Sequence, residues 1–583
     1  MAVIKRRVVN DAVHPNDELA HWPPILQRIF RARGIVSSAA LDKRLQALLP
    51  FHALKGIDDA SKRLSDAVIK QQRILVVGDF DVDGATSSAL AVAALRAMGA
   101  RHVEFLVPNR FEFGYGLTPG IVDVAARWQP NLIITVDNGM SSIDGVARAN
   151  ELGIDVLITD HHLPVPVLPA ACAVVNPNQA GDVFLSKAMA GVWVIFYVML
   201  ALRQQLRDNG WFTSQGLNEP NMAHYLDLVA LGTVADVVPL DHNNRIMVSQ
   251  GLARMRQGLC RPGILALIQV AGRECSALRE SDLGFAVGPR LNAAGRLDDM
   301  SLGIDCLLAE TMEEALRLAR ELDELNQQRR LIEAEMSEQA LLALQRVDNL
   351  HEGKTQAALP VALCLMDDSF HQGVIGLLAG RLKDRYARPT IIFAPGDAGE
   401  IKGSARSIAQ LNIRDVLAAV DGLHPGLIVK FGGHAMAAGL TLQAHAFDAF
   451  AQAFLTEVSR HVDATDCQGE ILSDGPLASH DLTLALAKQL QEAGPWGQQF
   501  PEPVFDNRFE ILEQRTVGKN HLKLALQHEA GGEVIDAIMF NVDAKQWPNH
   551  RARYLHAAYK LDINNYRNRE TMQLMLLCIS PVA

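Results

Sequence analysis

The segment from residue 74 to residue 84 reads Ile74-Leu-Val-Val-Gly-Asp-Phe-Asp-Val-Asp-Gly84, an apolar run followed by three alternating aspartates. The apolar run is typical of a buried β-strand, and residues 85–98 have the pattern of a helix. Residues two apart in an extended segment share a face, so Asp79, Asp81 and Asp83 can converge on one point. Carboxylates that converge repel one another unless a cation binds, and oxygen ligands suit Mg²⁺ or Mn²⁺. A calcium loop of the EF type is the alternative, but the spaced glutamate that it needs is missing.

Three further acidic signatures follow in order: Val136-Asp-Asn-Gly139, Asp160-His-His162 and Gly232-Thr-Val-Ala-Asp236. The first two come directly after apolar runs at 132–136 and 156–159, where an open α/β sheet places its ligands. Asp236 ends a predicted helix in an apolar segment, where a carboxylate needs a partner. Alone, Asp-Asn-Gly is usually a turn and a histidine pair is usually surface decoration. Their succession predicts one catalytic site formed by Asp79, Asp81, Asp83, Asp137, Asp160, His161, His162 and Asp236.

The composition is that of a globular protein of several domains. The 583 residues are 49% hydrophobic and 21% charged, and the seven cysteines are scattered without a Cys-x-x-Cys pair. Disulfides and thiolate zinc sites are therefore disfavoured. The basic N-terminal residues lack the apolar core of a signal peptide, and the longest apolar run, 188–202, is too short to span a bilayer. We expect a soluble, cytoplasmic protein without a membrane partner.

The net charge of −11 argues weakly against a nucleic-acid partner, because nucleic-acid-binding domains are usually basic. Carboxylates that bind metal inflate the acidic count, however, and the bound cations invert the local sign. Net charge alone therefore does not exclude a polyanionic substrate.

The order of predicted elements indicates an α/β fold. Apolar strands alternate with helices after residue 73, which predicts a parallel sheet with helices on both faces. We expect an N-terminal extension of irregular structure at 1–50, a catalytic domain at 51–310, a long connecting helix at 311–347, a smaller α/β domain at 348–460 and a small β-barrel domain at 461–583. An ordinary core helix with a break near Asn326 is the alternative for the long helix.

The motif series resembles that of the DHH phosphoesterase superfamily. Gly288-Pro-Arg-Leu-Asn-Ala-Ala-Gly-Arg-Leu297 extends the resemblance, and Gly403-Ser-Ala-Arg406 with Phe431-Gly-Gly-His-Ala-Met-Ala-Ala-Gly439 resembles the associated DHHA1 domain. With Asn109-Arg-Phe-Glu-Phe-Gly-Tyr-Gly116 and Gly494-Pro-Trp-Gly497, the chain is similar to the RecJ family of bacterial single-strand-specific 5′→3′ exonucleases. The resemblance is strong over about residues 70–510 and is mostly one of pattern beyond. It implies an OB-like nucleic-acid-binding barrel at the C-terminus.

The resemblance also implies roles for the acidic residues and two bound ions, Mg²⁺ or Mn²⁺. One ion would be held by Asp79, Asp81 and Asp137. The other would be held by Asp83, Asp137, His161 and Asp236, with Asp137 bridging. His162 would contact phosphate or exchange a proton, and Asp160 would orient its neighbours. Some relatives have a histidine where this chain has Val77, which departs from the family pattern at the first ion.

The implied activity is two-metal hydrolysis of single-stranded DNA from its 5′ end, releasing 5′-mononucleotides, in DNA repair and recombination. A monomer that works with single-strand-binding protein and a helicase is expected. The candidate substrate-binding residues are Arg110 at a 5′-phosphate pocket, Arg290, Asn292, Arg296, Lys402, Arg406, Gly432, Gly433 and His434. Arg290 or Arg296 could instead pair with Asp298 and Asp299, and the two glycines could simply form a tight turn.

The C-terminal tail interleaves basic residues with Tyr554, Tyr559 and Tyr566, which is the composition of a single-strand-binding surface. A barrel with core tyrosines is the alternative interpretation. Two other functions remain open: a hydrolase of small phosphates such as pyrophosphate or cyclic dinucleotides, and a metal-free nucleic-acid-binding factor with a degenerate site.

Overall fold

The computed structural model describes residues 3–8, 18–108, 113, 116–349, 360–463, 466–518, 520–542, 547–566 and 569–582. The chain divides into two compact units. One comprises Val9–Asn326 with Lys488–Glu502, and the other comprises Met1–Val8, Gln327–Ala487 and Pro503–Ala583. Each unit is described by itself below.

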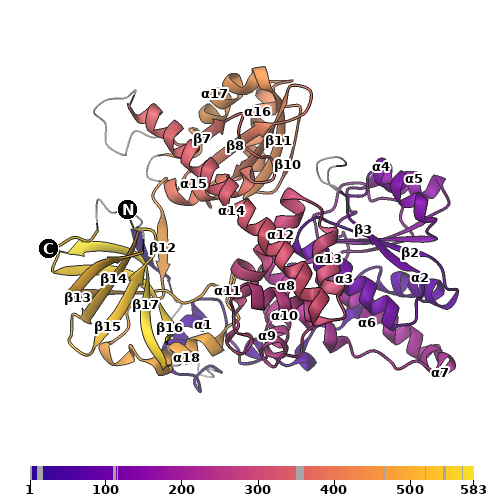
Figure 1. Cartoon of the computed structure of the whole chain (residues 1–583), viewed down its shortest axis with the longest axis horizontal. Coiled ribbons are helices and arrows are strands. Elements are labelled where there is room, and N and C mark those ends of the chain that lie inside the picture. The colour runs from indigo at the N-terminus through magenta and orange to yellow at the C-terminus, as the bar shows by residue number, and fades with distance from the viewer. Residues whose placement is uncertain are drawn as a thin grey trace. The chain divides into compact units, whose positions relative to one another are not determined.

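A five-stranded parallel sheet forms the centre of the first unit (Figure 1). Its strand order is β3 (Val103–Leu106), β2 (Ile74–Gly78), β4 (Leu132–Val136), β5 (Asp155–Thr159) and β6 (Ala173–Val175). The strands β2 and β4 are buried throughout, as expected where helices cover both faces of a parallel sheet. Gly78 pairs with Val136, and Val136 pairs with Thr159, so β2, β4 and β5 end side by side. The predicted parallel α/β sheet is confirmed.

Helices on both faces bury this sheet. On one face, α4 (Pro119–Ala125) and α5 (Ile143–Glu151) share a hydrophobic core with Leu75 and Val77 of β2. On the other, α3 (Val82–Ala97) packs with α6 (Gly191–Asp208) and α8 (Leu226–Ala235). Further helices complete the unit: α2 (Ile57–Ile69), α7 (Trp211–Gln215), α9 (His242–Arg256), α10 (Pro262–Val270), α11 (Glu280–Asp282), α12 (Gly288–Leu297) and α13 (Ser301–Leu308).

The N-terminal residues are more regular than predicted. The helix α1 (Pro24–Arg31) begins after Pro23, and it buries Leu26, Ile29 and Phe30. The strand β1 (Val3–Arg6) pairs in parallel with β12 (Glu470–Ser473), far along the chain. The prediction of an irregular extension was wrong here, because a four-residue edge strand gains its partner only through the tertiary fold.

The long helix α14 runs unbroken from Met312 to Asn349, close to the predicted range. It begins in the first unit and ends in the second, and the division falls between Asn326 and Gln327. The expected alternative of a break near Asn326 is not observed.

The second unit contains a mixed sheet and a barrel. The sheet order is β10 (Lys430–Gly433), β11 (Ala437–Gln443), β9 (Glu400–Arg406), β8 (Thr390–Pro395) and β7 (Leu363–Met366). Only β7 and β8 pair in parallel. The helices α15 (Ile375–Tyr386), α16 (Ile413–Leu423) and α17 (Phe447–Val458) accompany it, which gives the predicted smaller α/β domain.

The closed barrel consists of β13 (Phe505–Val517), β14 (His521–His528), β15 (Val534–Met539), β17 (Arg569–Val582) and β16 (Tyr554–Tyr566), and α18 (Leu484–Ala493) precedes it. Tyr559 is fully buried in it, and its hydroxyl donates to Oδ1 of Asn507 at 2.7 Å. Tyr559 is therefore a core residue and not a stacking platform for DNA.

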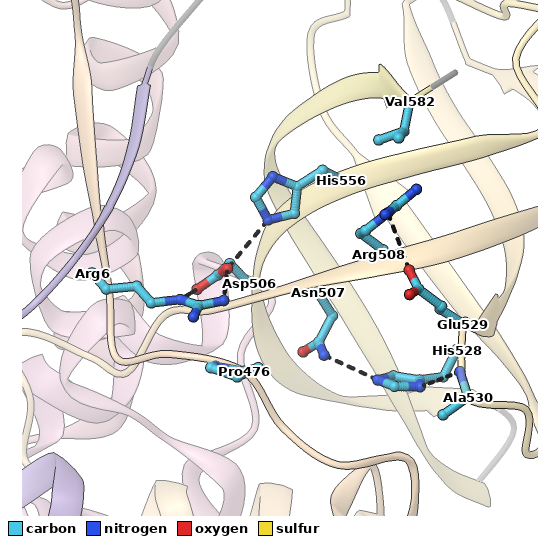
Figure 2. Close-up of a pocket in the computed structure, with 10 residues that line it drawn as sticks. All are labelled: Arg6, Pro476, Asp506, Asn507, Arg508, His528, Glu529, Ala530, His556 and Val582. Atoms are coloured by element: carbon cyan, nitrogen blue, oxygen red, sulfur yellow. Dashed lines mark hydrogen bonds and ion pairs between the residues drawn. The ribbon is translucent and has the colours of Figure 1, made fainter.

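A pocket of about 630 Å³, lined mainly by polar and charged residues, lies where the N-terminal strand meets the barrel (Figure 2). Arg6, Asp506 and His556 converge there, and Arg508 pairs with Glu529. Asp506 is the central residue of this hydrogen-bond network, because it accepts hydrogen bonds from Arg6, Ser473 and His556. The hydrogen bonds around this pocket thus connect the first residues of the chain to the barrel.

No helix among the described residues is long and apolar enough to cross a membrane.

Candidate metal centre

The loop after β2 positions the first three aspartates. Asp81 is the N-cap of α3 and accepts a hydrogen bond from the backbone N–H of Gly84 at 3.1 Å. Asp83 lies in the first turn of the same helix and is 1% exposed. Its Oδ2 and Oδ1 accept from the backbone N–H groups of Gly191 and Val192, at 2.5 and 2.9 Å. These are the first residues of α6, so the positive end of that helix stabilises the Asp83 carboxylate.

Asp137 lies at the centre of the cluster. It follows β4 with a φ of 62°, an unusual backbone conformation for a residue other than glycine, and its N–H donates to the carbonyl of Thr159 at 3.1 Å. Nε2 of His161 lies 3.1 Å from Oδ1 of Asp137 and 3.6 Å from Oδ2 of Asp236. The ends of β4, β5 and α8 therefore meet at this point, as the sequence predicted.

Asp160 orients the two histidines. The buried carboxylate accepts from the backbone N–H groups of His161 and His162 at 2.7 and 3.0 Å, and from that of Met140 at 2.9 Å. Nδ1 of His162 lies 2.7 Å from Oδ1 of Asp160, which leaves Nε2 of the ring directed elsewhere. A carboxylate that receives this many donors holds the whole turn in one conformation.

Burial and mutual repulsion disfavour ionisation of the clustered carboxyl groups. Burial, followed by the charge of Asp81, raises the pKa of Asp83 to about 7. Burial and the neighbouring carboxylates, Asp83 first among them, hold the pKa values of Asp137 and Asp236 well above the usual range. Burial lowers the pKa of His162, but its bond to Asp160 and the nearby negative charges outweigh this, so the pKa is raised overall.

This donor set fits divalent cations. Three groups of side chains have ligand atoms within 4.8 Å of one another: Asp79, Asp81 and Asp137; Asp83, His161 and Asp236; and Asp137, His161 and His162. Asp137 and His161 each belong to two of the three groups. Burial and mutual repulsion keep such carboxyl groups protonated, and they release their protons when a cation binds among them. Oxygen-rich sites with imidazole suit Mg²⁺ or Mn²⁺.

Several supporting residues could not be recognised from the sequence. The side-chain amides of Asn176 and Asn178 donate to the backbone carbonyls of His162 and His161, at 2.9 and 2.6 Å. The Asn138 amide donates to the carbonyls of Val77 and Val136, which ties the ends of β2 and β4 together. An Asn-Pro-Asn stretch after a strand is an ordinary loop signal, so nothing in the sequence distinguished it.

Three glycines allow the elements to approach this closely. A Cβ on Gly191 would lie 2.6 Å from Cβ of Asp137, and one on Gly232 would lie 2.9 Å from Oδ1 of Asp83. A Cβ on Gly295 of α12 would lie 1.9 Å from the carbonyl oxygen of Phe80. The helix α12 therefore packs directly against the loop that carries Asp79 and Asp81.

The predicted substrate-binding residues divide between the two units. In the first unit, Arg290 pairs with Asp323 of α14 at 2.8 Å, and not with Asp298 or Asp299. Asn292 and Arg296 are half-buried on the same helix, α12. Arg110 lies outside the described residues.

The remaining candidates lie on the sheet of the second unit. Lys402 and Arg406 alternate with buried residues along β9, and Nζ of Lys402 lies 2.8 Å from Glu400. Gly432 pairs with Gly439 of β11, and a Cβ on Gly432 would meet nothing within 4 Å. Gly433 has a φ of 141°, which favours glycine, and His434 follows it in the exposed turn. This sheet therefore exposes backbone on its glycine-rich edge.

Family models match three parts of the chain: the DHH family N-terminal domain at residues 73–233, the DHHA1 domain at 358–460 and the RecJ OB domain at 473–577. The chain is 52% identical to the single-stranded-DNA-specific exonuclease RecJ of Dickeya dadantii, over 96% of both chains. Two crystal structures of RecJ from Thermus thermophilus cover 100% of this chain. The complex with Mn²⁺ has a TM-score of 0.81, 27% identity and 80% coverage of that chain; the complex with Mg²⁺ has 0.75, 26% and 79%. A chain with this domain series, this sequence identity and this cluster of potential metal ligands belongs to the RecJ family of exonucleases.

Proposed function

We propose that this protein is a metal-dependent exonuclease specific for single-stranded DNA, which hydrolyses phosphodiester bonds from the 5′ end and releases 5′-mononucleotides. The observation that carries the proposal is the overlap of three potential metal-ligand groups at Asp137 and His161. The RecJ relative supports the choice of a DNA single strand over pyrophosphate or a cyclic dinucleotide. The RecJ OB domain supports a long nucleic-acid substrate.

Two divalent cations, when bound, supply an activated water and stabilise the attacking and leaving oxygens of an in-line displacement. Side chains of this protein would hold these cations in place. Asp137 shares one group with Asp79 and Asp81 and another with His161, which is also grouped with Asp83 and Asp236; this supports a bridging position for its carboxylate. Asp83 is held by the N-terminus of α6, so its oxygens have a fixed direction.

His162 is the proton-holding residue in this proposal. Asp160 binds its Nδ1 and raises the tendency of the ring to carry a proton, as the raised pKa indicates. A protonated imidazole directs Nε2–H to a non-bridging phosphate oxygen or to the leaving group. His162 thus neutralises charge on the phosphate while Asp160 fixes the ring.

The substrate strand is proposed to contact the remaining candidates. Arg290, Asn292 and Arg296 of α12 and Lys402 and Arg406 of β9 offer donors for phosphates. Gly432, Gly433 and His434 offer exposed backbone. Arg110 is proposed as the contact of the 5′-phosphate by resemblance alone. If so, Arg110→Ala reduces the preference for 5′-phosphorylated over 5′-hydroxyl strands, as measured on paired oligonucleotides.

The proposed domain limits are those expected from the sequence: catalytic domain 51–310, connecting helix 311–347, DHHA1 domain 348–460 and OB-like domain 461–583. We further propose a monomer that acts in DNA repair and recombination with single-strand-binding protein and a helicase. None of the seven cysteines, all of which lie among the described residues, forms a disulfide, which supports a reducing, cytoplasmic location.

The decisive experiment is digestion of one oligonucleotide labelled at either end, with Mg²⁺, Mn²⁺ or EDTA. Stepwise shortening of the 3′-labelled strand, together with immediate release of a labelled mononucleotide from the 5′-labelled strand, is expected only with metal. Pyrophosphate, a cyclic dinucleotide and a blunt duplex serve as competing substrates. Preferred hydrolysis of either small phosphate would overturn the proposal, as would equal digestion of the duplex.

A further inference from the structure

An exposed apolar side chain immediately follows the metal cluster. The helix α8 ends at Ala235, Asp236 caps it, and Val237 comes next with a φ of 60° and 64% exposure. The N–H of Val237 still bonds to the carbonyl of Val234 at 3.3 Å. Glycine is the residue that usually takes this conformation after a helix, and a β-branched side chain makes it unfavourable. The chain therefore accepts backbone strain and exposes an isopropyl group directly beside a predicted metal ligand.

A second exposed apolar side chain belongs to a turn that packs on the same end of α8. Phe285 lies in a π-helical turn, Leu283–Val287, and is 84% exposed, compared with 42% for Trp128 and 49% for Phe540. Its neighbours Leu283, Ala286 and Val287 are buried. The turn packs on the last turn of α8, because a Cβ on Gly284 would lie 3.4 Å from Cγ1 of Val234 and one on Gly288 would lie 3.7 Å from Cβ of Ala235. Widened turns of this kind are rare and are frequently found at functional sites.

These two observations point to the same ligand. Contact of a phenyl ring and an isopropyl group with water is unfavourable, and each depends on an uncommon backbone conformation for its exposure. Val237 directly follows Asp236, and the turn that carries Phe285 packs against Val234 and Ala235, the two residues before Asp236, whose carboxylate belongs to the cluster of potential metal ligands. In the proposed reaction, a group bound beside this cluster belongs to a nucleotide next to the phosphate that is cleaved. The flat apolar group in a nucleotide is the base, and aromatic stacking accepts every base.

We propose that Phe285 and Val237 form an apolar platform on which a nucleobase next to the scissile phosphodiester stacks. This inference rests on the proposed nuclease activity. The platform positions the strand without reading its sequence, since each base has a face that can stack. It also favours single strands, because a base inside a duplex has both faces covered by its neighbours. Phe285 and Val237 are thus positioning residues, and the metal ligands remain the catalytic ones.

The test combines loss of the ring with loss of the base. For Phe285→Ala on a 3′-labelled single strand, KM is expected to rise about tenfold, the size of one base-stacking interaction. The free energy of unfolding in urea is expected to stay unchanged because the side chain is exposed. A second strand carries abasic tetrahydrofuran residues at its 5′ end. The wild-type protein is expected to lose about tenfold in kcat/KM on that strand, and Phe285→Ala is expected to lose little further.

Two more variants separate positioning from structure. Val237→Gly removes the side chain and also relieves the backbone strain, so the thermal midpoint is expected to stay or rise while KM rises. Trp128→Ala is the matched control. Trp128 precedes the amino end of β4, whereas the candidate metal ligands follow the carboxyl ends of the strands, so the KM of this variant is expected to equal the wild-type value.

If Phe285→Ala and the abasic strand each lowered kcat/KM by the same factor and the two losses multiplied when combined, the proposed platform would be overturned. Unchanged kinetics of Phe285→Ala would overturn it as well. The latter result would assign the exposed ring to another protein or to another part of this chain. A wild-type protein that degrades no single strand would instead contradict the proposed function itself, so the two failures are distinguishable.

Discussion

Nε2 of His161 lies 3.1 Å from Oδ1 of Asp137, although the two residues end different strands and are separated by 23 intervening positions. The contact exists because β4 and β5 pair in parallel and end together, with Val136 opposite Thr159. Asp137 also lies within ligand distance of Asp79 and Asp81. A single carboxylate thus joins side chains from the ends of three adjacent strands.

This central position predicts the effect of Asp137→Ala. Removal of the shared carboxylate is expected to reduce kcat by roughly a thousandfold, equivalent to about 4 kcal/mol of lost transition-state stabilisation. Binding of single-stranded DNA, measured by fluorescence anisotropy in EDTA, is expected to remain. Asp66→Ala is the control, since Asp66 is an exposed partner of Lys70 one helical turn away. Turnover at the wild-type level in Asp137→Ala would remove the residue from the bridging role.

The raised carboxyl pKa values predict how metal stabilisation depends on pH. Burial and the charge of Asp81 raise the pKa of Asp83 from 3.8 to about 7, so between these values the folded protein binds more protons than the unfolded chain. The free energy of unfolding contributed by Asp83 therefore falls as pH rises through this window in EDTA. A divalent cation competes with the protons, so its stabilising effect is expected to grow with pH.

Thermal midpoints measured with EDTA and with Mg²⁺ at several values from about pH 5.5 to about pH 8 check this expectation. The difference between the two midpoints is expected to increase with pH and to increase less steeply in Asp83→Asn. A difference that stays constant across the range would show that these carboxyl groups do not exchange protons for metal.

The convergence of these acidic and histidine side chains could be predicted from the sequence because the signals are local. Each strand ends within its own motif, and parallel pairing brings such ends together whatever the rest of the chain does. Gly78, Val136 and Thr159 each end a strand and directly precede an aspartate. Because Val136 pairs with both Gly78 and Thr159, the three acidic motifs come together. The clustering of these aspartates could therefore be expected without knowledge of distant contacts.

The supporting contacts were not predictable, because each joins elements that are far apart in sequence. Arg290 was expected to bind phosphate or to pair with Asp298 or Asp299, and its carboxylate partner is Asp323 on α14. The approach of Gly191 to Asp137 depends on where α6 meets β4, and the pairing of β1 with β12 depends on residues more than 460 positions apart. Tyr559 looked like a stacking residue because alternation along a strand does not tell which face is inside a closed barrel.

Gly191→Ala tests whether this close approach matters for the metal centre. An added Cβ would lie 2.6 Å from Cβ and 2.7 Å from Oδ1 of Asp137, so the carboxylate or the start of α6 must shift. A displacement of about 1 Å can cost roughly a hundredfold in rate, and we expect a loss of that order in kcat together with weaker Mn²⁺ binding by calorimetry.

The matched substitution is Gly422→Ala in α16, where an added Cβ meets nothing within 4 Å. It is expected to leave activity unchanged and to stabilise the helix by about 0.5–1 kcal/mol. Equal activity in both variants would mean that α6 yields without moving Asp137.

The network around Asp506 predicts how the N-terminal strand contributes to stability (Figure 2). Burial raises the pKa of Asp506, but the hydrogen bonds from Arg6, Ser473 and His556 outweigh it, so the pKa is lowered overall. The carboxylate therefore stabilises the fold above the usual pKa of an aspartate, and this contribution is lost as pH falls through the lowered value. Asp506→Ala leaves these donors without their shared acceptor and is expected to lower the free energy of unfolding by about 3 kcal/mol in urea at neutral pH.

Lys5→Ala provides the comparison within the same strand, because Lys5 and Glu470 form an exposed ion pair that is expected to contribute at most about 1 kcal/mol. Hydrogen exchange of the β1 amides is expected to accelerate in Asp506→Ala and to change little in Lys5→Ala. If both variants lose the same small amount of stability and β1 stays protected, then strand pairing with β12 alone holds the N-terminus, and the buried carboxylate is not its anchor.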